Sequence, residues 1–119
     1  MSFQQAIQSG FQNYANFQGR AGLSAFWYWV LFVFVVNIVM SFIGAMIGGS
    51  ILGLLVSLGL IVPNIAVGAR RLHDTGKSGW YQLAGLIPVL GWIYVIYLLV
   101  QPGDVGSNAF GDGPMAPPV

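Results

Sequence analysis

The sequence contains no cysteine, only three acidic residues and a single histidine. Without cysteine the chain forms no disulfide, offers no thiol nucleophile and cannot build cysteine-based zinc or iron–sulfur sites. One His and three Asp are too few for us to expect a dedicated metal site. We therefore predict neither a metal nor a cofactor.

Charge of either sign is also scarce. Only 6% of the 119 residues are charged, 56% are hydrophobic and the mean hydropathy is +0.76. Soluble domains are typically about a quarter charged, so lipid rather than water must solvate much of this surface. The net charge of +1 is not gathered into a basic stripe, and we expect no nucleic-acid partner.

What the chain does have is long uncharged segments. No charged residue lies between Ala21 and Ala69, a run too long for one crossing of a bilayer core, which takes about 20 helical residues. Gly48-Gly49-Ser50 divides it into predicted transmembrane helices over 26–47 and 51–69, and a third is predicted over 80–100. The predicted fold class is an all-α integral membrane protein with three transmembrane helices in a single domain, residues 1–119.

The two ends differ from these segments. Phe3, Ile7, Phe11 and Tyr14 recur at helical spacing among glutamines, which predicts an amphipathic helix over 2–18 lying in the membrane interface. The alternative is a weakly helical tail. Residues 101–119 are rich in Gly and Pro, and we expect them to be irregular.

Orientation follows from the cations. Three crossings would place the N-terminal arm and the loop at 70–79 on one side, and the C-terminal tail on the other. The first side then carries all four Lys and Arg residues: Arg20, Arg70, Arg71 and Lys77. The positive-inside rule makes that side cytoplasmic. We predict a multi-pass protein with the N-terminus in the cytoplasm and the C-terminus outside.

A rival topology breaks the third segment at Pro88 and Gly91 into two halves that return the tail to the cytoplasm. Each half is too short to cross, and irregular backbone exposed to lipid is heavily penalised, so we rank this topology second.

The polar island RRLHDTGKSGW at 70–80 is the obvious candidate site. A phosphate-binding loop would need Gly at position 71, where Arg71 stands. His73 and Asp74 are neighbours on a helix and point about 100° apart, so they do not form a catalytic pair by default. No other nucleophile motif is present, and we predict that the protein is not an enzyme.

The same residues suit a turn at a membrane surface. Asp74 can pair with Arg70 or Arg71 one turn earlier, Gly76 suits a helix C-cap and Ser78 a helix N-cap. Such a density of cations could also hold an anionic lipid headgroup or an acidic partner segment. The predicted lipid-binding or partner-binding residues are therefore Arg20, Arg70, Arg71, His73, Asp74 and Lys77.

An alternative function is a subunit of an oligomeric pore or transporter, with Asn37, Ser57 and Asn64 turned toward a shared lumen. Helical phase distinguishes the two. A single protein-lined cavity for Asn37, Ser41, Ser57 and Asn64 would favour the pore, and separate packing contacts would count against it. In either case a homo- or hetero-oligomer is possible.

Three motifs together resemble the bacterial inner-membrane family known as domain of unknown function 805: Gly19-Arg20-Ala21 before Phe26-Trp27, the run from Ala69 to Trp80, and Gly106-Ser107-Asn108 with Phe110-Gly111 and Pro114. The resemblance implies a small multi-span inner-membrane protein of no established activity. Leu23 and Ala25 stand where the family usually has Arg and Glu. If the family's charges pair with the central loop, the resemblance leaves Arg20, Arg71 and Asp74 to do so here. A tail motif that works with this loop would have to share its side.

Overall fold

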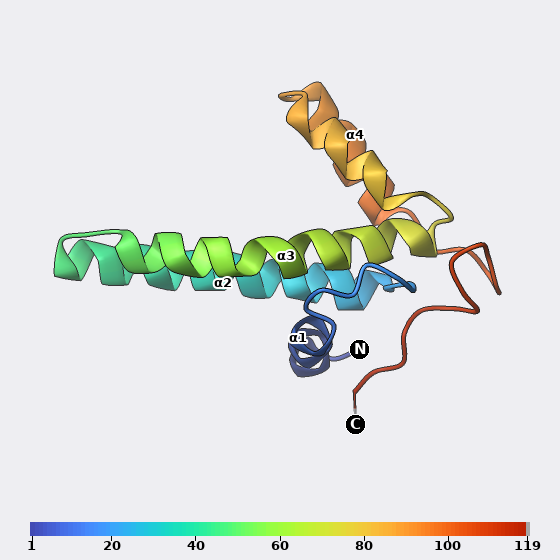
Figure 1. The fold of residues 1–119 in the computed structure, drawn as a ribbon, viewed down its shortest axis with the longest axis horizontal. Coiled ribbons are helices and arrows are strands. Elements are labelled where there is room, and N and C mark those ends of the chain that lie inside the picture. Colours follow the sequence, from blue (N-terminus) through green and yellow to red (C-terminus); the bar gives the residue numbers. More distant parts are fainter. Residues whose placement is uncertain (119) are drawn as a thin grey trace.

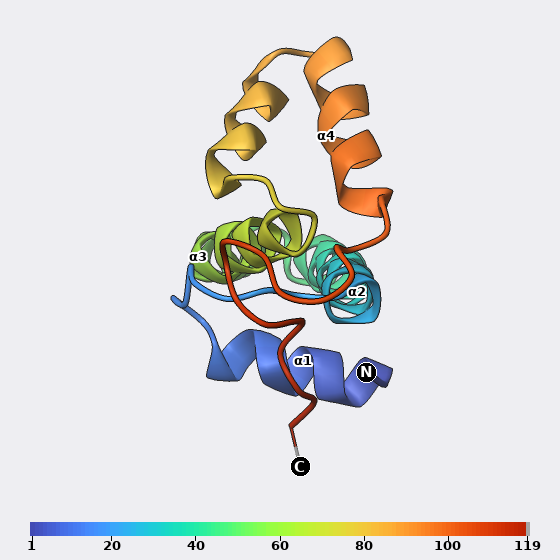
Figure 2. The same ribbon diagram turned by 90° about the vertical axis from the view of Figure 1, so that its right-hand side faces the viewer.

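The chain, described over residues 1–118 by a computed structural model, is helical throughout its regular structure (Figure 1). The described residues form five helices and no strand, which confirms the all-α prediction for them: α1 (Phe3–Gln12), α2 (Leu23–Ile47), α3 (Ile51–Asp74), the 3₁₀ helix η1 (Gly79–Leu86) and α4 (Leu90–Val100). Seen end-on they form three tiers, with α1 on one side of the α2–α3 pair and η1–α4 on the other (Figure 2).

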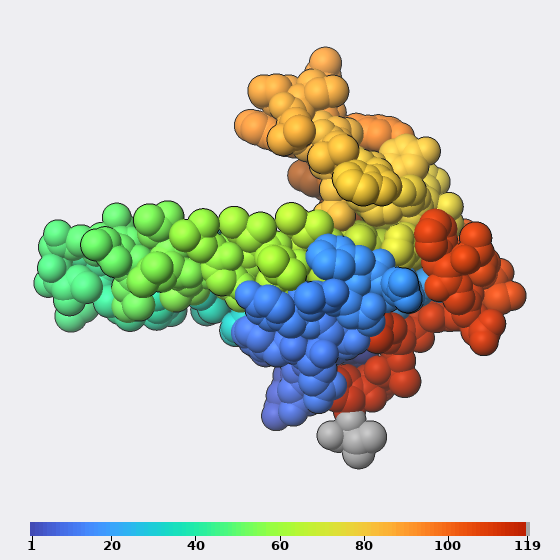
Figure 3. Space-filling model, viewed as in Figure 1, coloured from blue at the N-terminus to red at the C-terminus, as the bar shows by residue number. Residues whose placement is uncertain are grey.

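The α2–α3 hairpin matches the first two predicted spans. Both helices are long and apolar enough to cross a membrane, and 25 residues of α2 rise about 37 Å, against a core about 30 Å thick. Gly48 ends α2 in the left-handed conformation at φ 74°, which favours glycine. α3 runs past the expected end at residue 69 to Asp74, so the first half of the polar island is helical. The outer half of the hairpin projects alone beyond the other elements (Figure 3).

The single helix predicted over 80–100 is wrong. The segment folds back on itself at residues 87–89, and η1 and α4 lie side by side (Figure 2). At 11 residues, α4 rises only about 16 Å and does not reach across a bilayer core. The arrangement that we ranked second, with a break at Pro88 and Gly91, agrees with this part of the structure.

Four local features accompany the fold-back. Pro88 cannot continue a helix from η1, and Gly91 is buried so close to η1 that an added Cβ would lie 1.8 Å from the Ala84 carbonyl oxygen. The Trp92 indole N–H donates across the turn to the Gly85 carbonyl at 2.9 Å. Val89 has φ 65° and ψ −69° and is spanned by a Leu90 N–H to Pro88 carbonyl bond of 2.8 Å, a strained γ-turn for a β-branched residue.

Helix α1 covers the early part of α2. It is shorter than the predicted 2–18, begins at a Ser2–Gln5 capping box, and buries Ala6, Ser9 and Gly10. A Cβ on Gly10 would lie 2.2 Å from the Trp29 ring, so this contact requires glycine. The amphipathic helix is thus present over 3–12, and its place in the membrane interface stays a prediction.

Tyr14 ties the N-terminal arm to α3. Pro63 lies inside α3 and has no N–H, which leaves the Gly59 carbonyl, one turn earlier, without its usual helical donor. The Tyr14 hydroxyl donates to that carbonyl. A broken backbone bond is thereby satisfied from another segment, as helices surrounded by lipid require.

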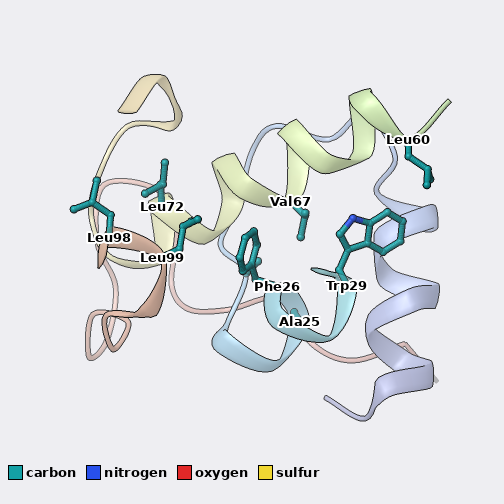
Figure 4. Packing of buried hydrophobic residues seen from close by; sticks show 9 residues of the cluster. Ala25, Phe26, Trp29, Leu60, Val67, Leu72, Leu98 and Leu99 are labelled. Atoms are coloured by element: carbon teal, nitrogen blue, oxygen red, sulfur yellow. The ribbon is translucent and has the colours of Figure 1, made fainter. Parts of the chain in front are cut away.

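The apolar core lies at the end of the hairpin that carries the loop (Figure 4). Phe26 and Trp29 from α2 meet Val67 and Leu72 from α3, and Leu99 of α4 joins them. Burying each large apolar side chain contributes about 1.5–3 kcal/mol. This packing gives the loop end a buried core, on which the polar site is built.

Candidate functional site

The loop after α3, the segment before α2 and the C-terminal tail meet at one end of the molecule (Figure 1). The Asp104 N–H donates to the Asp74 carbonyl at 2.7 Å, and the Met115 N–H donates to the Arg20 carbonyl at 2.8 Å. Placing the tail on the opposite side from the loop was therefore wrong, because the fold-back at 87–89 returns it. The structure places the tail on the same side as the central loop, as the family resemblance required.

Asp74 is the centre of this site. Its carboxylate accepts from Arg20 Nε at 2.9 Å and from an Arg71 terminal nitrogen at 2.8 Å. The Asp74 side chain is 4% exposed, and both guanidinium groups are fully buried. Of the two partners that helical spacing offered Asp74, Arg71 is the one used, and the trio suggested by the resemblance forms.

Arg20 holds the tail through backbone carbonyls. It donates to the Gly106 carbonyl at 2.6 Å, to the Asp104 carbonyl at 2.8 Å and to the Gly111 carbonyl at 3.1 Å. Gly103 lets the tail approach, because a Cβ there would lie 2.0 Å from an Asp74 carboxylate oxygen. Arg20 and Asp74 together hold the C-terminal tail against the end of α3.

Arg71 performs a similar task for α4. Its guanidinium donates to the Leu99 carbonyl at 3.1 Å, to the Ala21 carbonyl at 3.2 Å and to the Gln101 carbonyl. Leu99 and Gln101 stand at the end of α4, where helix carbonyls have no intrahelical donor. Arg71 thus caps α4 from another helix.

Arg70 points to the N-terminal arm. One terminal nitrogen donates to the Asn16 carbonyl at 2.5 Å and to the Asn13 carbonyl at 3.1 Å. Its Nε is buried and has no hydrogen-bond partner within the described residues. All three arginines of the predicted site therefore turn inward, toward protein oxygens.

His73 lies on a different face from Asp74, as expected. Its Nδ1 is 3.0 Å from the Gly19 carbonyl oxygen, and its ring stacks on Phe110 with centroids 4.1 Å apart and planes within 3°. Asn108 donates to the His73 carbonyl at 2.9 Å. Two tail residues that were not among the predicted site residues thus contact His73: Phe110 packs on its ring and Asn108 bonds to its backbone. The tail motif quoted in the family resemblance, which contains Asn108 and Phe110, was the available signal.

Lys77 is the remaining cation. It is partly exposed, and no ion pair or side-chain hydrogen bond joins it to another described residue. The predicted caps around it are present: Gly76 is left-handed at φ 79°, and the Ser78 hydroxyl accepts from the Trp80 N–H at 3.3 Å. Trp80 beside it is 78% exposed.

The polar residues of the hairpin are divided between two places. Asn37, Ser41 and Ser57 line one groove of about 300 Å³ together with Ser50. Asn64 instead accepts from the Trp29 indole N–H at 2.8 Å and packs between helices. Of the four residues whose placement tests the pore hypothesis, three therefore share one groove and Asn64 does not.

Comparison with known proteins finds a family and relatives. Residues 14–112 match the family described as "Protein of unknown function (DUF805)". "Inner membrane protein YhaH" of Escherichia coli strain K12 is 34% identical over 113 residues, covering 90% of this chain and 93% of that protein. "Inner membrane protein YhaI" of the same strain is 32% identical over 105 residues, covering 87% and 89%. No solved structure gives a significant match.

Proposed function

The chain belongs to the family described as protein of unknown function (DUF805), and from that premise we propose that it is a small, non-enzymatic integral protein of the bacterial inner membrane whose loop at 70–79 binds anionic lipid. The printed names of the relatives support the location. The two long apolar helices support insertion.

The proposed topology has two crossings rather than three. α2 and α3 cross, η1 and α4 enter the membrane and return, and the N-terminal arm, the loop and the tail share one face. All four Lys and Arg residues lie at that end, so the positive-inside rule supports a cytoplasmic face for both termini. Exposed Trp80 and Tyr81 beside Lys77 suit the membrane–water boundary there.

The observation that carries the lipid proposal is the contrast between Lys77 and the three arginines. Arg20, Arg70 and Arg71 bond to protein oxygens, and their role is to build the loop and hold the tail. Lys77 is partly exposed beside these residues, and its ammonium group pairs with no acceptor in the described chain. A basic group at the cytoplasmic surface gains about 1 kcal/mol from anionic lipid. We therefore assign the lipid contact to Lys77, with His73 beside it.

The experiment compares lipid retention after purification of the full chain in mild detergent. Lys77→Gln should lower the retained anionic lipid about fivefold, which corresponds to about 1 kcal/mol. Asp112→Asn is the matched control, because it changes the charge of an exposed tail residue without removing a cation and should not lower the retained lipid. Unchanged retention in Lys77→Gln would contradict the lipid proposal and would favour an acidic partner segment in its place.

A second candidate, the subunit of an oligomeric pore, is favoured by the groove on the outer half of the hairpin. Asn37 is exposed there, at a depth where lipid offers no hydrogen bond, and several copies could turn their grooves to one lumen. The test is ion flux into protein-containing vesicles. Flux above that of empty vesicles that is lost in Asn37→Leu would support the pore, and flux equal to empty vesicles would exclude it.

A further inference from the structure

A cavity of about 290 Å³ opens beside His73 where α3 meets η1. Its volume is that of roughly ten waters in the liquid. It is lined by Phe17, Ile65, Ala69, His73, Ser78, Gly79, Trp80 and Gln82. The cavity is thus bounded by the N-terminal arm, the last turns of α3 and the start of η1.

The α3 wall changes from apolar to polar along its length. Ile65, Ala69 and His73 are spaced four residues apart and therefore share one face of the helix. With the bilayer boundary at residue 69, where the uncharged segment ends, Ile65 would lie at acyl-chain depth and His73, one turn beyond Ala69, would lie among the headgroups. An occupant of this cavity must be apolar at one end and polar at the other, as a phospholipid is.

The hydrogen-bonding state of His73 is set by its surroundings. The Gly19 carbonyl only accepts, so Nδ1 carries a proton, and in the uncharged form of the ring Nε2 keeps a lone pair. Nε2 lies toward Gly79, 3.8 Å from where a Cβ on that residue would be, and Gly79 is part of the cavity wall. The cavity therefore presents a hydrogen-bond acceptor that is held in place by the Gly19 bond and the Phe110 stack.

The other polar groups complement a phosphate. The Ser78 hydroxyl lines the cavity, accepts from Trp80 and keeps its own proton to donate. Lys77, the adjacent residue, supplies positive charge. A lipid headgroup bound here would therefore find a hydrogen-bond donor (Ser78) and a positive charge (Lys77) for its phosphate. It would also find an acceptor, His73 Nε2, for a hydroxyl group attached beyond the phosphate.

We propose that this cavity is a binding site for one phospholipid with an anionic phosphate and a hydroxylated headgroup, the chemistry of phosphatidylglycerol. Ser78 and Lys77 bind the phosphate, His73 Nε2 accepts from a headgroup hydroxyl, and the acyl chain runs along Ile65 and Phe17. The proposal rests on the proposed lipid binding and specifies which lipid the site selects.

The test separates phosphate recognition from hydroxyl recognition. Full-length protein is placed in nanodiscs of phosphatidylethanolamine with an equal minor share of either phosphatidylglycerol or phosphatidylethanol, a phosphodiester with the same single negative charge and no headgroup hydroxyl. Native mass spectrometry counts the bound lipids. The wild type should bind phosphatidylglycerol about fivefold more than phosphatidylethanol, which corresponds to one ordinary hydrogen bond, and should bind both more than phosphatidylethanolamine.

Two substitutions of His73 provide the matched pair. His73→Asn keeps a donor for the Gly19 carbonyl and removes the acceptor at Nε2, so the preference for phosphatidylglycerol should disappear. His73→Gln reaches as far as Nε2 with an amide oxygen and should keep most of it. Both variants lose the ring that stacks on Phe110, so a preference that is kept in His73→Gln and lost in His73→Asn reports the acceptor and not the stack.

Each outcome has one meaning. Equal binding of the two anionic lipids by the wild type, both above phosphatidylethanolamine, would refute this inference and leave the proposed function standing. No preference for either anionic lipid would refute both. A preference that survives in His73→Asn would show that Nε2 does not read the hydroxyl, and would overturn the assignment.

Discussion

Replacing Asp74 by Asn tests the buried charge network that holds the loop end together. The substitution keeps the size of the side chain and removes the negative charge that bridges Arg20 and Arg71 at 2.9 and 2.8 Å. Two fully buried guanidinium groups then face a neutral amide, whose NH₂ group cannot accept a hydrogen bond from either of them. Their carbonyl partners are dipoles and do not replace a charge.

The magnitude follows from the burial. Removing one partner of a buried ion pair costs about 3–5 kcal/mol, since the other charge stays desolvated. The two pairs share one carboxylate, so their losses do not add, and we expect about 3–5 kcal/mol in total. For a chain of this size that lowers the unfolding temperature by about 10 °C or more.

The assay is thermal unfolding in bicelles, followed by circular dichroism, together with limited proteolysis of the tail. Asp74→Asn should unfold earlier and expose residues 101–118 to the protease. Asp112→Asn, an exposed carboxylate of the same tail, should stay within about 0.5 kcal/mol of the wild type. Equal stability of the two variants would refute the reasoning, because it would mean that the buried arginines do not depend on Asp74.

Three further predictions concern close contacts. Gly10→Ala pushes a methyl into the Trp29 ring and should cost about 1–3 kcal/mol and speed hydrogen exchange in 3–12, whereas Gly59→Ala, with open space around its Cβ, should not. Tyr14→Phe should cost about 1 kcal/mol by leaving the Gly59 carbonyl unpaired. In a Pro63→Ala background that loss should shrink, and equal losses in both backgrounds would rule out the link. Gly103→Ala should release the tail to protease, while Gly113→Ala should not; cleavage of neither variant would count against the tail contact.

The hairpin could be predicted from the sequence, and the fold-back was ranked too low. Hydropathy and the glycines at 48–49 specify α2 and α3 locally. The segment over 80–100 is apolar enough to cross, and hydropathy is the same whether it crosses or returns. Pro88 and Gly91 were the available signals. Their effect depends on contacts with Ala84 and Gly85 that arise only once the segment has folded back.

The site was predictable in its local part. The pairing of Asp74 with Arg71 follows from helical spacing, and the addition of Arg20 came from the family resemblance. The capture of the tail was not predictable, because Arg20 and Arg71 bond to backbone carbonyls, which carry no sequence signature. The inward direction of Arg70 depends on where the 13–16 segment lies, which is also a tertiary matter.

The central claim is that the N-terminal arm, the loop and the tail share the cytoplasmic face while the α2–α3 turn lies outside. The chain has no cysteine, so single cysteines can be placed without further change. Ser50→Cys in the turn, and Ser2→Cys and Ser107→Cys at the other end, occupy exposed positions. With a membrane-impermeant maleimide on cells with an intact inner membrane, we predict labelling of Ser50→Cys alone, and labelling of all three once that membrane is broken. Labelling of Ser107→Cys in intact cells would contradict the account.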